Sequence, residues 1–195
     1  MSRLDAEQLA AGLAAIRGAP AETGTVEMIV RRPAENEREV VEEGLLTADE
    51  GLVGDYWQAR AGESTPIRAA DLDRQLTVMG SRVIDLLAGG DRAAWPLAGD
   101  QLYVDLDLGI ANLPAGTWLA IGDAVIEVTE PAHTGCAKFS ARFGSDALRF
   151  VNSPDGRALR LRGLHARVLR PGPVRRGDTV RRLPPTRSDG PRSAG

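Results

Sequence analysis

The sequence predicts a mainly β, α+β fold, in which a twisted, partly closed β-barrel carries a few inserted helices. The chain has 195 residues, a length that suits one domain with short terminal extensions. It contains 22 glycines and 12 prolines, which favour many short elements over a few long helices. In its second half, short segments of alternating apolar and polar residues follow one another, as strands of a barrel do.

Residues 1–20 are predicted to form an N-terminal helix ahead of the barrel. Ser2 and Asp5 resemble a capping box that would start this helix, and Gly18 would end it. The barrel domain is expected over residues 21–183, and residues 184–195 are expected to be a disordered tail with nothing to bury. One face of the helix carries the apolar side chains, which are Leu9, Leu13 and Ile16.

The strands are predicted from the alternation of apolar and polar residues. In the first strand, which starts at Gly24, Val26, Met28 and Val30 are expected to share one face. Residues 56–73 have no clear period and are predicted to be a long loop of the kind that often carries function. Further strands are expected at residues 38–46, 74–79, 101–107, 117–130, 165–170 and 178–183, with a tight turn at 121–124.

Two helical regions are predicted between the strands. Ser81 is expected to cap a short helix that Gly89 closes. Residues 136–151 also have a helical pattern, because Phe139 and Phe143 lie four positions apart. We therefore expect short helices directly after the single cysteine of the chain.

Charge and composition exclude several classes of function. The formal net charge is −3, so the chain has no global basic field with which to hold nucleic acid. No apolar run approaches the roughly 20 residues of a membrane span. The N-terminus lacks the apolar core of a secretory signal, which makes the cytoplasm the expected location. A single cysteine excludes an internal disulfide, a CxxC redox pair and a cysteine-based structural zinc site.

Chemically able residues converge between residues 128 and 143. A strand ends at Pro131, and Cys136 stands where the next helix is expected to begin. That position favours the thiolate, which is the form of cysteine that attacks, ligates metal or carries a persulfide. His133 lies three residues before the cysteine and Lys138 two residues after it. Cys136, His133 and Lys138 are therefore the candidate catalytic residues.

Two simpler interpretations of this segment stay open. A lone cysteine is often buried as a small apolar side chain, which would make Cys136 inert. Lys138 and Arg142 are four residues apart, so on a helix they share one face. That face is either an ordinary solvated surface or a basic rim for an anionic ligand, and spacing alone does not separate the two.

Several short motifs occur around Cys136 in a fixed order. Because of these motifs, residues 24–180 resemble the MOSC domain, which is named for the C-terminal domain of molybdenum cofactor sulfurases. Single motifs are weak, whereas their order around one cysteine is fairly specific. The matching residues are Gly24, Val26 and Ile29; Gly51, Leu52, Gly54 and Asp55; Arg74 to Thr77; Gly99 to Leu102; Ile121 to Thr129 with Pro131; and Gly163, Ala166, Val168, Gly172, Val174, Gly177 and Asp178.

The resemblance implies a barrel with a cleft that presents Cys136, which in some members is similar to a thiolate ligand of molybdenum in the molybdenum cofactor (molybdopterin). Arginine forks suit the phosphate of the pterin. The cofactor-binding candidates are accordingly Arg74, Asp55, Asp100 and Gln101 from the matched motifs, with Arg142 on the basic rim. Relatives usually have Glu-Asn at positions 100 and 101, so the hydrogen-bonding types survive here but their reach differs.

Three functions are consistent with these residues. In the first, the protein is a molybdenum-cofactor oxidoreductase that reduces N-hydroxylated or similar small molecules, with Cys136 as the metal ligand. It would then need an external electron-transfer protein, because the chain has no flavin, haem or iron–sulfur motif.

The second function is that of a sulfur carrier. Cys136 would receive a persulfide from a cysteine desulfurase, and the pyridoxal phosphate domain of the sulfurase relatives would have to belong to a partner protein, because the chain is too short to contain it. The third function is a non-catalytic β-barrel module that binds a small anion, with Cys136 merely packed.

Overall fold

The strands of the computed structural model close into a barrel, in the order β1-β11-β7-β8-β9-β5-β6 and back to β1. The structure describes residues 3–57, 59 and 72–184. Neighbouring barrel strands are antiparallel except β5 and β6, which are parallel. The predicted α+β barrel is confirmed. Its strands are β1 (Thr23–Arg31), β5 (Leu76–Gly80), β6 (Leu102–Asp105), β7 (Trp118–Ile121), β8 (Ala124–Val128), β9 (Leu164–Arg170) and β11 (Thr179–Arg182).

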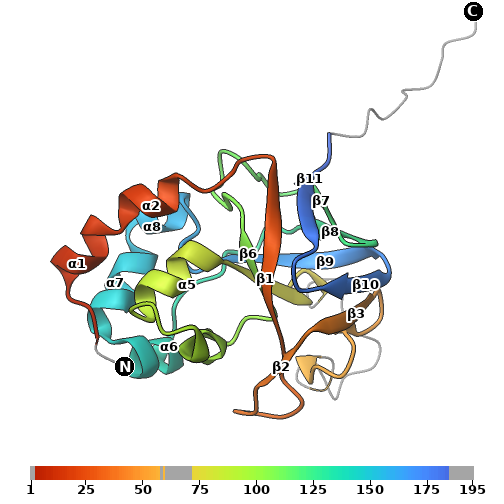
Figure 1. The fold of residues 1–195 in the computed structure, drawn as a ribbon, viewed down its shortest axis with the longest axis horizontal. Helices are drawn as coiled ribbons and strands as arrows, with labels where there is room; N and C mark the ends of the chain where they lie inside the picture. Colours follow the sequence, from red (N-terminus) through yellow and green to blue (C-terminus); the bar gives the residue numbers. More distant parts are fainter. Residues whose placement is uncertain (1–2, 58, 60–71, 185–195) are drawn as a thin grey trace, which may run out of the picture.

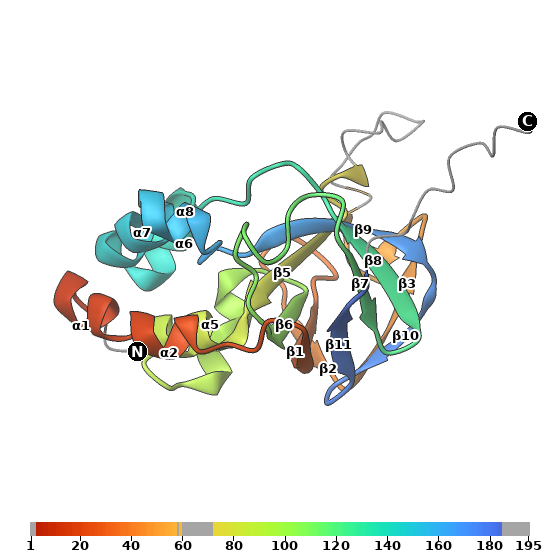
Figure 2. The same ribbon diagram turned by 90° about the horizontal axis from the view of Figure 1, so that it is seen from above.

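Helices cover one side of the barrel, and a small second sheet lies on the other side (Figures 1 and 2). The short strand β2 (Glu39–Val41) pairs with β1, and the second sheet has the order β10 (Gly172–Arg175), β3 (Glu43–Thr47) and β4 (Gly51–Leu52). The helices are α1 (Ala6–Ala11), α2 (Leu13–Arg17), α5 (Ser81–Leu87), the 3-10 helix η1 (Arg92–Ala98), α6 (Ala137–Phe143), α7 (Ser145–Asn152) and α8 (Pro154–Ala158).

Two apolar cores share the barrel wall. The first fills the barrel and includes Ile29 and Leu102, and the second lies between the wall and the helices and includes Val30 and Tyr103. Strands β1, β5 and β6 contribute to both cores, because successive side chains of a strand point to opposite faces. Both faces of these strands are therefore buried.

Strand β1 departs from the predicted alternation at one point. Val26 faces the barrel interior, whereas Met28 and Val30 pack with the helices, so the single shared face predicted for them is wrong. The pairing of β1 with β6 shifts between Val26 and Met28, which makes Glu27 an extra residue in the ladder. A β-bulge of this kind reverses the faces of the residues that follow it.

The N-terminal helix is two short helices rather than one. They meet at Gly12, where a Cβ would lie 2.4 Å from a side-chain carbon of Leu86 in α5, so α5 packs closely against this junction. The capping box joins Asp5 with Gln8. The predicted box of Ser2 with Asp5 is therefore wrong, and Ser2 lies outside the described residues. The predicted apolar face packs into the helical core, with Leu9, Leu13 and Ile16 as its members.

Other boundaries differ from the prediction in detail. Residues 38–46 form two strands, β2 and β3, instead of one. Ser81 is the first residue of α5 rather than its cap, because the N-cap is Gly80 and no side chain caps this end. Strand β10 and the short helices η1 and α8 were not predicted. The tight turn at 121–124 is confirmed, since Ile121 pairs with Ala124.

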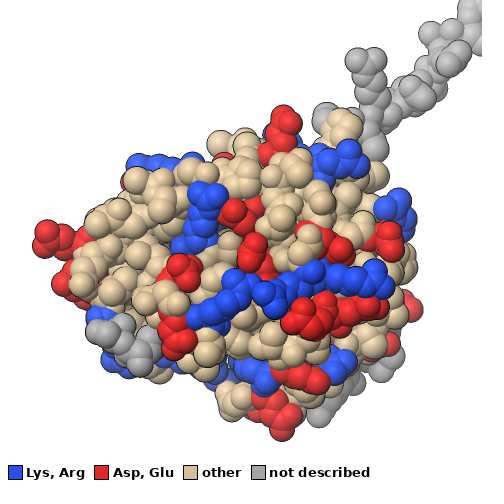
Figure 3. Space-filling model, viewed as in Figure 1, with Lys and Arg blue, Asp and Glu red and all other residues tan. Residues whose placement is uncertain are grey.

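Some predictions fall on residues that the structure does not describe. These are most of the loop at 56–73 and residues 185–195 of the tail, and the domain boundaries remain predictions. Among the described residues, no helix is both long and apolar enough to cross a membrane. On the face shown in Figure 3, a row of basic residues is flanked by acidic ones.

Candidate functional site

One pocket contains Cys136 and the residues predicted to act with it. Its volume is about 190 Å³, and it is built by the β1–β2 connection, the end of η1, the start of α6 and the start of β9. Of the predicted site residues, it brings together Cys136, His133, Lys138 and Arg142. The short helices predicted after the cysteine are confirmed as α6 and α7, and they place this segment against the barrel wall.

Cys136 is a free, exposed cysteine at the N-cap of α6. Its carbonyl oxygen accepts a hydrogen bond from the amide of Ser140 at 3.0 Å, while its side chain makes no capping bond. The interpretation that Cys136 is sealed in apolar packing is therefore wrong. Phe139 and Phe143 take the buried face of α6, with their ring centroids 5.0 Å apart, so the helix start and its thiol are left at the surface.

Asp100 lies beneath the pocket, with a fully buried side chain. Its Oδ2 accepts a hydrogen bond from Nη1 of Arg162 at 2.6 Å, and its Oδ1 lies 3.5 Å from Nδ1 of His133. Nη2 of Arg162 donates to the carbonyl of Ala98 at 2.9 Å. Burial raises the pKa of the Asp100 carboxyl above its usual value, and Arg162 offsets part of that rise.

The two histidines of the chain meet in this pocket. The ring centroids of His133 and His165 are 4.5 Å apart. His165 is on β9 and is buried, whereas His133 precedes α6 and is partly exposed. Since neutral imidazole can accept a proton and imidazolium can donate one, the pair is suited to hold a proton beside a ligand.

Basic side chains surround the pocket mouth. Nζ of Lys138, on α6, lies 2.6 Å from Oε1 of Glu35, on the β1–β2 connection. This contact lowers the pKa of Glu35. Arg142 donates to the carbonyl of Leu97 at 2.8 Å. The pKa of Arg38 is lowered, first by burial and then by the nearby charges of Arg142 and Arg32. Arg38 and Arg142 thus repel each other at the mouth, whereas Lys138 is paired with Glu35, and the role of this face as a basic rim stays a prediction.

Four predicted cofactor-binding residues do not line the pocket, namely Asp100, which lies beneath it, and Asp55, Gln101 and Arg74. Asp55 is buried against Arg32, with Nε of Arg32 2.7 Å from Oδ2 and Nη2 2.8 Å from Oδ1. Gln101 is buried and accepts from both the amide and the hydroxyl of Thr77, at 2.8 and 2.6 Å. Arg74 is exposed in the turn before β5. Asp55 supports the pocket indirectly, because Arg32, its partner, is a lining residue.

Sequence reasoning missed Arg38, Arg162 and His165. They come from segments far from Cys136 in the chain, so no local spacing links them to it. One available signal was rarity, because the chain has only two histidines and both line this pocket. The arginines had no such signal among the 24 basic residues.

The donor set of the pocket limits how a metal would be held. Within the described part of the chain, no group of three or more His, Cys, Asp or Glu side chains is arranged to bind a metal ion. A metal at this site would therefore bring most of its own ligands and take a single thiolate from Cys136. A pterin-bound molybdenum fits this requirement, since it arrives with soft sulfur ligands and negative charge.

Comparisons with known proteins agree with this architecture. The YuaD protein from Bacillus subtilis has a similar structure, with a TM-score of 0.59, 17% sequence identity and coverage of 81% of this chain and 94% of that one. YiiM from Escherichia coli is also similar, with a TM-score of 0.53, 20% sequence identity and coverage of 82% of this chain and 70% of that one. These identities show the fold alone. No curated protein matches the chain significantly. The family model of the MOSC domain matches residues 55–181, and the chain therefore belongs to the MOSC domain family.

Proposed function

We propose that this MOSC protein binds the molybdenum cofactor with the thiolate of Cys136 as a ligand, and that it reduces N-hydroxylated or similar small molecules. The observation that supports this most directly is the exposed thiol in a pocket lined by basic side chains. When bound, the cofactor would supply the two-electron redox chemistry that side chains lack. The electrons would come from an external electron-transfer protein.

The residues of the pocket fit the charge of this cofactor. Arg142 and Arg38 are placed to offset the negative charge of a phosphate or of the metal centre, through charge-assisted hydrogen bonds. The volume of about 190 Å³ is below the roughly 300–1,000 Å³ of pockets that enclose a whole organic ligand. The pocket would therefore hold one end of the cofactor, and the remainder would extend beyond it.

The histidine pair would handle protons next to the thiolate. Oδ1 of Asp100 lies 3.5 Å from Nδ1 of His133, within ion-pair distance although without a hydrogen bond, so a proton taken up by His133 would face a carboxylate. Lys138 would contribute little to either charge or proton transfer, because its ion pair with Glu35 already neutralises it.

Measurement of bound molybdenum tests the proposal. The chain would be co-expressed with the machinery for cofactor synthesis, and metal per chain would be measured for the wild type and for Cys136→Ser. We expect the variant to bind roughly tenfold less metal or lower still. Mutation of residues that merely orient a metal ligand already lowers metal affinity by about 10–100-fold, and removal of the ligand itself should have at least that effect. Arg182→Gln, at the other end of the barrel, is the control. Equal molybdenum in wild type and Cys136→Ser would contradict the proposal.

A second candidate is persulfide transfer, and the exposure of Cys136 favours it, because another protein must reach the sulfur. The Cys136 thiolate would attack the outer sulfur of a cysteine desulfurase persulfide. A new S–S bond forms as the old one breaks, and the desulfurase thiolate leaves with the electron pair. Mass spectrometry after incubation with desulfurase and cysteine should find one added sulfur on Cys136, and none in Cys136→Ala.

Failure of both measurements would leave a different function. If neither molybdenum nor sulfur is found on the wild-type protein, the pocket would be a simple binding site for a small anion, which the same basic lining would also serve. Binding of inorganic phosphate without any modification of Cys136 would be the positive evidence for this outcome.

A further inference from the structure

Two guanidinium groups converge on one point of the pocket, above Gly99. A Cβ built on Gly99 would lie 3.4 Å from Nη2 of Arg38 and 3.8 Å from Nη1 of Arg142. Arg38 comes from the β1–β2 connection and Arg142 from α6, so the fold brings these two cations together across the pocket. The charge of Arg142 acts against that of Arg38, and an anion bound between the two guanidiniums would offset this repulsion.

The remaining cations of the pocket already have carboxylate partners. Arg32 pairs with Asp55, Arg162 with Asp100 and Lys138 with Glu35. In contrast, Arg38 and Arg142 donate to the backbone carbonyls of Glu37 and Leu97, and no described carboxylate forms an ion pair with either of them. The two positive charges above Gly99 are therefore left for a ligand.

The pocket also contains buried donors that the described protein leaves unused. Nε of Arg38 and Nε of Arg162 are both buried, and neither has a hydrogen-bond partner among the described residues. Arg162 itself is only 7% exposed. An unsatisfied buried donor destabilises the folded protein, so its presence at a pocket wall indicates that a ligand or water supplies the acceptor.

Gly99 keeps the space between the guanidiniums open. Its φ of +88° lies in the left-handed region that glycine adopts without strain. A side chain here would be strained and would occupy the point on which Arg38 and Arg142 converge. The backbone thus provides a small cradle, rather than a side chain, beneath the two cations.

We propose that Arg38 and Arg142 form an oxyanion subsite above Gly99, and that its ligand is a small tetrahedral oxyanion carrying a transferable sulfur, of the thiosulfate class. The volume of about 190 Å³ suits such an ion, and Cys136 lines the same pocket. Guanidinium forks match the oxygens of a sulfonate group as they match those of a phosphate. This inference rests on the second candidate function, sulfur on Cys136, and names a small-molecule donor for it.

The transfer balances without an added oxidant or reductant. The Cys136 thiolate attacks the outer, sulfane sulfur of thiosulfate, and a Cys136 S–S bond forms. The bond between the sulfane sulfur and the sulfonate sulfur breaks, and sulfite leaves with its electron pair. Sulfite keeps the three oxygens that Arg38 and Arg142 would hold, so these cations stabilise the charge of the leaving group.

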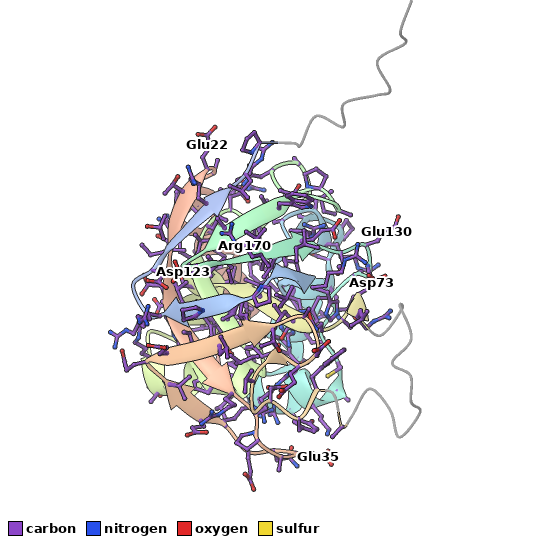
Figure 4. The ribbon with its side chains drawn as sticks, turned by 90° about the vertical axis from the view of Figure 1, so that its right-hand side faces the viewer. Glu22, Glu35, Asp73, Asp123, Glu130 and Arg170 are labelled. Carbon is purple, nitrogen blue, oxygen red and sulfur yellow. The ribbon has the colours of Figure 1, made fainter. Side chains whose placement is uncertain are left out.

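The test is a loading assay on the full chain with thiosulfate labelled at its outer sulfur. We expect one labelled sulfur on Cys136 and one sulfite released per chain. Arg38→Gln and Arg142→Gln should each slow loading by about tenfold, the effect of one lost charge-assisted hydrogen bond. Inorganic phosphate, which carries no transferable sulfur, should compete with thiosulfate. Arg182→Gln is the matched control, because it removes an arginine far from the pocket. The backbone amide of Arg182 donates to the carbonyl of Glu22, and Figure 4 shows Glu22 at the opposite end of the molecule from Glu35, which lines the pocket.

A second arm separates this inference from the proposed function. Desulfurase and cysteine should load Cys136 in the wild type and in Arg182→Gln, and circular dichroism with thermal unfolding checks that Arg38→Gln and Arg142→Gln are folded. Thiosulfate loading that is unchanged in both arginine variants would overturn the subsite. Loading by desulfurase but not by thiosulfate would overturn the inference and leave the carrier function intact, and loading by neither would overturn both.

Discussion

The protein contains two buried aspartate–arginine pairs that look alike in sequence and differ in structure. Asp55 accepts hydrogen bonds from the amide, Nε and Nη2 of Arg32 and from the amide of Trp57, at 2.7 to 3.0 Å. Asp100 accepts one strong bond from Arg162, and its other oxygen, Oδ1, is buried without a hydrogen bond from the described residues. The first pair is satisfied within the fold, whereas the second has capacity left over and borders the pocket.

This difference indicates that the Asp55–Arg32 pair is structural and that the Asp100–Arg162 pair belongs to the candidate site. A buried carboxylate with a full set of donors stabilises the connection between β1 and the following turn, and it has no lone pair left for chemistry. A buried carboxylate with an unused oxygen next to His133 costs stability, and its retention is expected at a site that binds or reacts. The free energy of unfolding should therefore distinguish the two pairs.

The largest expected effect is on the satisfied pair. Asp55→Asn should lower the free energy of unfolding by about 3–5 kcal/mol, because the buried charge of Arg32 loses its partner and an amide cannot accept all the hydrogen bonds that Asp55 accepts. Asp100→Asn also leaves a buried arginine, but it should cost only about 1–3 kcal/mol, because the carboxylate already carries a burial penalty and an amide oxygen can still accept its hydrogen bond from Arg162. Urea unfolding of the two variants measures both values. Equal losses would remove the contrast between the pairs.

A pH series should sharpen the comparison. In Arg162→Met, burial acts on Asp100 without its main opposing cation, and only weaker contributions such as that of Arg32 remain, so the folded-state pKa of Asp100 lies further above its unfolded value. The folded protein then binds a proton more tightly than the unfolded chain. Stability is consequently retained below the unfolded pKa and lost as the pH rises through the raised folded pKa.

The matched variant is Arg32→Met. In this variant Asp55 keeps the backbone amides of residues 32 and 57 as hydrogen-bond donors, whereas Asp100 has no such donors among the described residues in Arg162→Met. Unfolding midpoints at about pH 4.5 and about pH 8 give the comparison. If Arg162→Met loses no more stability at the higher pH than Arg32→Met does, Asp100 is not the less satisfied carboxylate.

The smallest effect concerns the exposed pair at the pocket mouth. Lys138 lowers the pKa of Glu35, so Lys138→Gln should bring that pKa back up towards its ordinary value of 4.5. The stability linked to this depressed pKa is present above the unfolded value and lost as the pH falls. It is negligible here because both side chains are exposed. An NMR titration of the Glu35 carboxyl checks the shift, and an unchanged pKa would show that the contact does not persist in solution.

Sequence reasoning identified the barrel, the helices after Cys136 and the position of the thiol at a helix start. These features depend on the local spacing of apolar residues, on turn residues and on the order of motifs, all of which can be read directly from the sequence. It placed Val26, Met28 and Val30 on one face because a bulge leaves no local mark. It also missed Gly12 as a break, since only the approach of α5 shows why a glycine stands there.

The candidate site was predicted only as far as one segment reaches. His133, Cys136, Lys138 and Arg142 lie within ten residues of one another, and the structure confirms that they share a pocket. The other walls come from segments brought together by the closure of the barrel, and their arginines are indistinguishable in sequence from those that form surface ion pairs. Which carboxylates retain unused oxygens is a property of packing, and no spacing rule reports it.

The extra residue in β1 links barrel architecture to the pocket. Arg92, near the start of η1, donates to both the carbonyl and the carboxylate of Glu27. Because η1 ends next to Gly99, these hydrogen bonds from Arg92 to the bulge hold the segment that leads to the proposed oxyanion subsite. Deletion of Glu27 would give β1 a regular ladder with β6 and would remove this anchor of η1, so one residue remote from the thiol influences how the pocket wall is held.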